Sequence, residues 1–144
     1  MLVKPSIKEV KAASKKAPYD VIQADNSAHV VKDVPTGITA YIIYKAYDNA
    51  STMLKTADAE TIVMERVKED GTIVMSLCTP DLGITQKSYT TSQTSQPLVR
   101  KVVLNGTYKL AGSYDNVKLT ENGGLTMIEA TCLHGQPVEF LLVK

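Results

Sequence analysis

Two histidines and a loose group of carboxylates are the side chains in this sequence that could move protons. His29 follows Ala28 in a run typical of a β-strand, and His134 precedes Gly135 in a predicted turn. Neither has a serine, cysteine or carboxylate at a spacing typical of an activated nucleophile. Both are therefore predicted to be structural histidines held by hydrogen bonds.

The carboxylates Glu65, Glu69, Asp70 and Asp81 lie around one predicted hairpin. Paired carboxylates can carry glycosidase chemistry, but the spacing selects no pair, and two of the four are ordinary turn residues. The sequence has no Gly-rich phosphate loop or calcium loop. Two cysteines and two scattered histidines are too few for a metal site. We predict no catalytic, cofactor-binding or metal-binding residue in this chain, and no cofactor.

Three tyrosines, Tyr41, Tyr44 and Tyr47, could form an aromatic platform for a sugar. In a regular strand Tyr41 and Tyr47 share one face, whereas Tyr44 points the other way. Core packing is favoured over sugar binding for that reason.

Cys78 and Cys132 lie in apolar, β-like runs. Buried free thiols are favoured, because two cysteines in 144 residues are not a disulfide scaffold. A disulfide stays open if the two strands are neighbours.

The composition is that of one globular domain, with 44% hydrophobic and 22% charged residues. Residues 1–18 carry five lysines and one glutamate, whereas the rest of the chain has 11 basic and 14 acidic residues. A slightly acidic body argues against binding nucleic acid or heparin-type polymers, which needs clustered Lys and Arg. No apolar run is long enough to span a bilayer. We expect neither nucleic-acid nor membrane partners.

Residues 6–17 are the only segment with a helical pattern. Ser6 can cap the first turn, and apolar residues recur three or four positions apart along one side. The lysines on another side are interpreted as a solvated face rather than a basic binding patch. Pro18 ends the segment.

The remainder is predicted to be β throughout. Strands at residues 19–24 and 28–33 flank a turn, and residues 38–47 form one long strand. Asp70-Gly71 and Asn105-Gly106 each predict a hairpin with a tight primed turn. A further turn is marked by Asn122-Gly123-Gly124, and the polar residues 83–97 are an exposed strand or a surface loop.

The strands around residues 60–68 and 71–78 have an unusual pattern. Apolar residues occupy consecutive positions at 62–64 and 73–75, so neither strand alternates cleanly between apolar and polar. Strands of this kind lie centrally in a sheet or between two covering layers.

About nine or ten short strands with a single helical segment predict an all-β fold. We expect a two-sheet antiparallel β-sandwich at residues 19–144, with a short N-terminal helix or linker at residues 1–18. The last strand, which ends at Lys144, should pair inside a sheet.

The order of these elements resembles the C-terminal β-domain of chondroitin sulfate ABC lyases, in family 8 of the polysaccharide lyases. The most specific match is Thr79-Pro80-Asp81-Leu82, directly after the predicted hairpin. The other matching segments are moderately specific strand patterns: Tyr19–Ile22, Ala28–Val31, Thr36–Tyr41, Thr61–Met64, Val103–Tyr108, and the ending from Leu125–Met127 to Gly135–Glu139.

The resemblance implies a parent enzyme that cleaves glycosaminoglycans by β-elimination, abstracting the uronic acid C5 proton and expelling the 4-linked sugar. The catalytic Asn, His, Tyr, Arg and Glu of that family lie in an upstream α/α toroid and at its junction with a central β-sandwich. None of their motifs occurs in this sequence, so no catalytic role passes to any residue here.

We therefore expect the non-catalytic C-terminal domain of a chondroitin or hyaluronan lyase, which packs on upstream domains of the same polypeptide and supports the substrate cleft. The alternative is an accessory glycan-binding module, which would be favoured by an exposed stripe of two or more coplanar tyrosines, or by Lys45, Arg100 and Lys101 gathered on one surface. An unrelated extracellular adhesion sandwich is a third hypothesis. The resemblance implies a secreted or periplasmic protein, with its signal on a missing N-terminal part.

Overall fold

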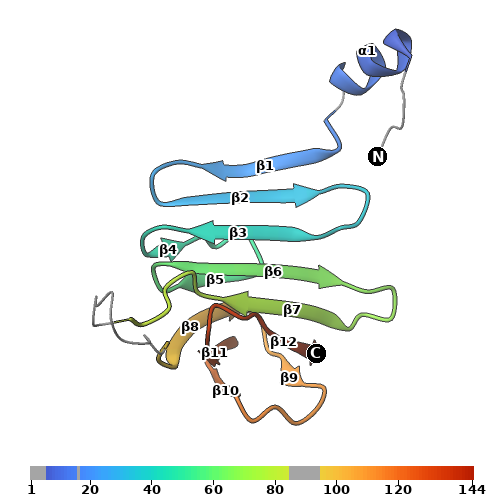
Figure 1. Cartoon of the computed structure of the whole chain (residues 1–144). Helices are drawn as coiled ribbons and strands as arrows, with labels where there is room; N and C mark the ends of the chain where they lie inside the picture. The colour runs from blue at the N-terminus through green and yellow to red at the C-terminus, as the bar shows by residue number, and fades with distance from the viewer. Residues whose placement is uncertain (1–5, 16, 85–94) are drawn as a thin grey trace.

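The computed structural model describes residues 6–15, 17–84 and 95–144. These residues form one helix and twelve strands (Figure 1): α1 (Ile7–Lys15), β1 (Tyr19–Ala24), β2 (Ala28–Asp33), β3 (Thr39–Ile43), β4 (Tyr47–Asp48), β5 (Leu54–Ala57), β6 (Thr61–Val67), β7 (Ile73–Cys78), β8 (Leu98–Asn105), β9 (Lys109–Leu110), β10 (Val117–Asn122), β11 (Leu125–Cys132) and β12 (Val138–Val143). The surplus over the predicted number includes β4, which is the end of the predicted strand at residues 38–47, and β5, for which no strand was predicted.

The strands form two antiparallel sheets, which confirms the predicted sandwich. The seven-stranded sheet has the order β1-β2-β3-β6-β7-β12-β9, and the five-stranded sheet has the order β10-β11-β8-β5-β4. Figure 1 views the seven-stranded sheet face-on, with the five-stranded sheet behind its lower part. As predicted, the last strand pairs inside a sheet, between β7 and β9.

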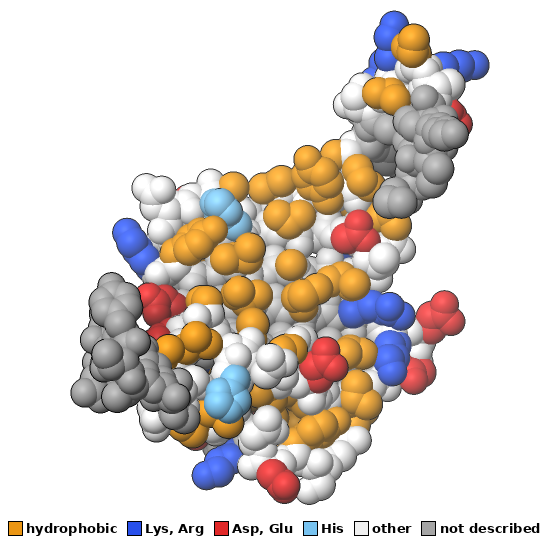
Figure 2. Space-filling view, in the orientation of Figure 1, with side chains coloured by type: hydrophobic (Ala, Val, Ile, Leu, Met, Phe, Trp, Pro, Cys, Tyr) orange, Lys and Arg blue, Asp and Glu red, His pale blue; other side chains and the backbone are white. Residues whose placement is uncertain are grey.

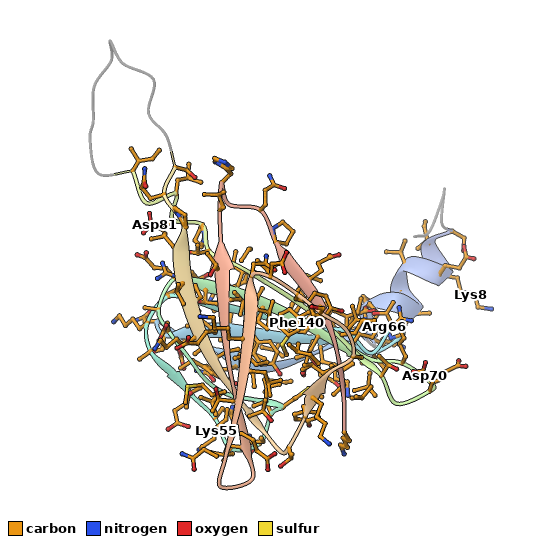
Figure 3. All side chains as sticks on the ribbon, turned by 90° about the horizontal axis from the view of Figure 1, so that it is seen from below. Lys8, Lys55, Arg66, Asp70, Asp81 and Phe140 are labelled. Atoms are coloured by element: carbon orange, nitrogen blue, oxygen red, sulfur yellow. The ribbon has the colours of Figure 1, made fainter. Side chains whose placement is uncertain are left out.

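The core lies between the sheets and follows the alternation of each strand. In β7 the inward side chains are Ile73, Met75 and Leu77, all at most 2% exposed. They face the same layer as Phe140 of the neighbouring β12, which is 1% exposed and lies between the two sheets in Figure 3. A one-residue slip of either strand would turn this whole apolar set to solvent, so burial fixes the register.

Helix α1 is capped as the sequence predicts. The Ser6 hydroxyl accepts the Glu9 N–H at 3.3 Å, and the Glu9 carboxylate accepts the Ser6 N–H at 2.7 Å, which together make a capping box. Its apolar side is not covered, because Ile7 is 77% and Val10 is 50% exposed. In Figure 1 the helix stands away from the sandwich, beyond β1.

The hairpin between β6 and β7 forms as predicted, but its turn is not a primed turn. Only Gly71 has a positive φ, at 82°, and its N–H donates to the Lys68 carbonyl at 3.0 Å. Residues 68–72 separate the strands, so the loop is too long for a two-residue turn and uses a left-handed glycine at its end. A primed turn occurs instead between β10 and β11, where Gly123 and Gly124 both have positive φ.

The hairpin predicted at Asn105-Gly106 is wrong. Strand β8 pairs with β11 and β5, whereas β9 pairs with β12 in the other sheet. The Asn105 side chain instead donates to the Thr52 carbonyl at 2.8 Å, and Gly106 (φ 108°) begins the crossing between sheets. A dipeptide signal reports a local bend and cannot report which strand the chain pairs with after it.

The long strand predicted at residues 38–47 is two strands in different sheets. Strand β3 ends at Ile43 and β4 begins at Tyr47, where it pairs with β5. Both Tyr41 and Tyr47 are buried and their rings meet edge to face at 6.0 Å, so the favoured core role is confirmed for these two. Tyr44, between the strands, is 47% exposed. The prediction for residues 83–97 falls mostly on residues outside the described part of the chain.

The two edges of the seven-stranded sheet differ. At one edge β9 covers only Leu142 and Val143, but the Ala111 N–H donates to the Leu141 carbonyl at 2.9 Å. The Tyr114 hydroxyl accepts the Leu141 N–H at 3.0 Å. Backbone groups of β12 are thus satisfied by a short strand, a loop and a phenol. At the other edge, β1 pairs with β2 alone among the described strands.

Replacing Phe140 with alanine should lower the free energy of unfolding by about 3–5 kcal/mol, because the substitution leaves a cavity between closely packed sheets. Urea denaturation followed by circular dichroism measures the change. Val99→Ala is the matched control, since Val99 is 49% exposed and should shift stability by about 0.5 kcal/mol or less. Equal losses in both variants would contradict the assigned core.

Candidate functional site

Glu65 is the one charged side chain that the described residues bury, at 8% exposure. It points inward because it continues the alternation of Thr61 and Val63 along β6. The Tyr41 hydroxyl of β3 donates to Glu65 Oε1 at 2.8 Å. The second oxygen, Oε2, is buried and has no hydrogen-bond partner among the described residues.

The surroundings favour the neutral form of this pair. Burial raises the pKa of the Glu65 carboxyl, and hydrogen bonds from Tyr41 and Thr39 oppose that rise. Burial and the neighbouring Glu65 raise the pKa of the Tyr41 phenol. A pocket of about 170 Å³ adjoins the pair and is lined by Ile22, Lys32, Thr39, Tyr41, Ser51, Thr52, Met53 and Glu65. Because Oε2 itself is covered by protein atoms, we assign the pair to packing between the sheets rather than to proton transfer with a ligand.

Glu65→Gln keeps an acceptor for Tyr41 and removes the titrating group. The folded-state pKa of Glu65 lies above its unfolded value, so the folded state binds more protons and wild-type stability falls as pH rises through this range. Relative to wild type, the variant should therefore gain stability between about pH 4 and pH 7. Urea denaturation at a series of pH values measures the difference, and Glu139→Gln controls for the loss of one exposed carboxylate. A difference that shrinks or reverses as pH rises would contradict the assignment.

The Thr79–Leu82 segment, which gives the most specific part of the resemblance, has a structural role. Thr79 is 1% exposed, and its hydroxyl donates to the Glu60 carbonyl at 2.9 Å. The same hydroxyl accepts from Arg100 Nη2 at 3.0 Å. Glu60 has a φ of 56°, which is uncommon for a residue other than glycine, so this bond holds a strained connection between β5 and β6. Asp81 lies 3.9 Å from the Arg100 guanidinium.

Thr79→Val removes the shared hydroxyl while keeping the shape of the side chain. It leaves the Glu60 carbonyl and the Arg100 Nη2 without this partner, which should lower the free energy of unfolding by about 1–3 kcal/mol. Thr120→Val, on the exposed side of β10, is the control. Thermal denaturation compares the two variants, and an unchanged midpoint for Thr79→Val would show that the hydroxyl is dispensable.

Both histidines are hydrogen-bonded, as predicted, but to partners that the sequence did not indicate. His134 Nδ1 lies 2.9 Å from the Ser95 hydroxyl, which also accepts the His134 N–H at 3.0 Å. His29 Nδ1 lies 3.4 Å from the Tyr44 hydroxyl, with the rings edge to face. No carboxylate among the described residues hydrogen-bonds the other ring nitrogen of His134. The Ser95–His134 contact therefore lacks an orienting acid, and we interpret it as a tie between the β11–β12 turn and the start of β8.

The other candidate carboxylates are not brought together. Asp70 is exposed in the β6–β7 turn, and Asp81 lies toward the opposite end of the sandwich (Figure 3). Glu69 is also exposed in the turn. Among residues 6–15, 17–84 and 95–144, no group of three or more His, Cys, Asp or Glu side chains could hold a metal ion.

Cys78 and Cys132 are both free thiols, in agreement with the favoured interpretation. Burial raises the pKa of each thiol, so both favour the unreactive protonated form. No helix in the described part of the chain is long and apolar enough to cross a membrane.

The basic residues proposed as a glycan surface are turned to different sides. Arg100 points inward toward Thr79, while Lys101 points outward from the same strand and pairs with Glu129 at 2.7 Å. Lys45 is exposed between β3 and β4. Because Arg100 points inward and Lys101 pairs with Glu129 on the outward side of β8, Arg100 and Lys101 do not form one basic surface.

One face of the seven-stranded sheet is rich in exposed apolar side chains, as the consecutive apolar residues at 62–64 and 73–75 indicated. We define the outer face as the side of the seven-stranded sheet that points away from the five-stranded sheet. Hydrophobic side chains spread over this face in Figure 2. The register sets them in adjacent rows, one of which runs through Val21, Val31, Ala40 and Met64, and another through Ile42 and Ile62.

A shallow groove of about 290 Å³ continues the outer face. Its floor is formed by the small side chains Val74 and Ser76 of β7, with Met64, Arg66 and Glu139 beside them. The Arg66 and Lys68 side chains line it as well, and none of the ion pairs within the described residues involves Arg66, Lys68 or Glu139. The groove therefore has a floor of small side chains, and its sides carry charged groups of both signs that form no ion pair within the described residues.

The fold and these sites define an antiparallel β-sandwich domain whose buried polar groups serve packing. No family model matches the chain. In sequence it is 28% identical, over 86% of its length, to the chondroitin sulfate ABC endolyase of Proteus vulgaris, and 27% identical, over 54% of its length, to the chondroitin sulfate ABC exolyase of Bacteroides thetaiotaomicron. The chain spans only 12% and 8% of the lengths of these two relatives.

Solved structures give the same result for the fold. The chain superposes on two structures of the chondroitin AC lyase of Streptomyces coelicolor A3, one of a variant enzyme and one in complex with chondroitin sulphate, with TM-scores of 0.69 and 0.68. The sequence identity is 16% in both, and the match covers 97% and 96% of this chain but 17% of the other. The predicted resemblance to a chondroitin lyase β-domain is thereby confirmed.

Proposed function

We propose that this chain is a non-catalytic domain of a larger glycosaminoglycan lyase, in which it supports the domains that perform β-elimination. The observation that carries the proposal is the coverage: 86% of this chain matches a stretch that makes up only 12% of a chondroitin sulfate ABC endolyase. A segment that makes up so small a part of such an enzyme corresponds to one accessory domain and leaves most of the enzyme for the domains that perform the reaction.

The side chains support the same proposal. The buried Tyr41–Glu65 pair is held between the sheets, and among the described residues no carboxylate hydrogen-bonds His134, the partner of Ser95. Proton abstraction next to a uronic acid carboxylate needs a base within hydrogen-bond reach of the substrate and groups that stabilise the developing charge. The described residues bring no such set together in a pocket.

The domain limits and the location are part of the proposal. Residues 19–144 would be the domain, and residues 1–18 with their lysines would connect it to the preceding domain. A secreted or periplasmic location follows from the polymeric, extracellular nature of glycosaminoglycans. An accessory glycan-binding role is less favoured, because Arg100 points inward to Thr79 while Lys101 pairs with Glu129 on the exposed side of the five-stranded sheet, so the two do not form one basic surface.

The isolated chain should be folded and inactive toward chondroitin sulfate. Incubation of the purified chain with the polymer, followed by absorbance of the unsaturated product, should give no rise above a heat-treated control, because the described residues bring no proton-abstracting set together. A protein-dependent rise would overturn the non-catalytic assignment. Calorimetric titration with chondroitin and hyaluronan oligosaccharides tests binding separately from activity. Measurable heat of binding would favour the glycan-binding alternative.

A further inference from the structure

The outer face breaks the usual pattern of a sandwich. In an antiparallel sheet with one solvated side, outward positions are normally polar. Here the outward residues Ile42, Met64 and Tyr44 are 41%, 43% and 47% exposed. Apolar residues therefore occupy both sides of the central strands, the pattern that predicts two covering layers. The five-stranded sheet supplies one of these layers, and the described residues supply no layer on the other side.

The outward side of the five-stranded sheet, on the opposite side of the molecule, carries charged residues typical of a solvated face. The outward positions of the five-stranded sheet include Lys101 and Glu129, whose side chains form an ion pair at 2.7 Å. Lys118 of β10 is exposed on the strand beside them. The five-stranded sheet also exposes the apolar side chains of Val99 and Met127, but these are interspersed with charged residues. On the outer face, by contrast, exposed apolar side chains follow one another across neighbouring strands.

We propose that the outer face is the surface against which another domain of the same polypeptide packs, and that the groove along β7 receives side chains from that domain. This inference rests on the proposed function. The polypeptide can supply such a layer, because the relatives are roughly eight to twelve times longer than the matched part. Contiguous exposed apolar surface of this kind marks interaction sites.

The charges at the groove indicate which polar groups the partner surface should carry. Arg66 and Lys68 line the groove without an ion-pair partner in the described residues, and Glu139 lies across β7 from them. A packed layer would bury these groups, and buried charges need counter-charges. The facing surface should accordingly be apolar, with a carboxylate opposite Arg66 and Lys68 and a hydrogen-bond donor opposite Glu139.

Two methionines allow a direct test, since they have similar exposure on opposite sides of the sandwich. Met64 is 43% exposed on the outer face, and Met127 is 36% exposed on the five-stranded sheet. Oxidation by dilute hydrogen peroxide, followed by mass spectrometry, is measured in this chain alone and in the full polypeptide encoded by its gene. In the isolated chain both should oxidise at comparable rates. In the full polypeptide Met64 should be protected about tenfold or more while Met127 is unchanged, because oxidation follows exposure.

A second experiment places a charge in the proposed interface. Ile42→Lys should leave the isolated chain folded, because Ile42 is 41% exposed, but in the full polypeptide it should return Met64 oxidation to the rate of the isolated chain. Val99→Lys, at a 49% exposed position on the other sheet, is the matched control and should leave Met64 protected.

Several outcomes would overturn the inference. Equal oxidation of Met64 in the isolated chain and the full polypeptide would do so, as would a gene that encodes no further domain. A dimer of the isolated chain in sedimentation equilibrium, with Met64 already protected, would assign the face to a second copy instead. Lyase activity of the same full polypeptide separates the two proposals: activity with unprotected Met64 rejects only the docking face, and protection without activity rejects only the lyase function.

Discussion

The structure depends on the alternation of side chains along β7 and β12, the central strands that place Ile73, Met75 and Phe140 between the sheets. Burial of this set stabilises the fold, since each large apolar side chain contributes about 1.5–3 kcal/mol when removed from water. It also fixes register, because sliding either strand by one residue would exchange buried and exposed faces. The positions of Glu65, Thr79 and the groove all follow from that register.

The fold class could be predicted from the sequence because it rests on local signals. Strands β1 and β2 lie at the predicted residues, and Ser6 caps the helix. The errors concern pairing over long distances in sequence. The chain changes sheet at Tyr44–Ala46, and Asn105-Gly106 begins a crossing rather than a hairpin. A β-pattern gives the direction of side chains but does not identify the sheet that a strand joins, which only packing decides.

The buried polar contacts illustrate the same limit. Glu65 shares the inward face of β6 with Thr61 and Val63, so its position could have been inferred from alternation. Its partner Tyr41 is 24 residues away and is set by the pairing of β3 with β6. The hydroxyl of Thr79 joins Glu60 to Arg100 across two sheets, and no spacing in the sequence indicates this. The Thr79–Leu82 segment, on which the predicted resemblance most depends, thus stabilises the fold through the Thr79 hydroxyl.

The unequal edges of the seven-stranded sheet limit how copies of this domain could aggregate. The β12 edge is capped by β9, Ala111 and the Tyr114 hydroxyl, while β1 is the edge whose backbone groups stay open to another strand. Growth of a fibre by continued strand addition requires two open edges on each sheet, so that every added copy exposes a new template. Because the described residues leave one edge of this sheet open, joining of molecules through it would end at a pair.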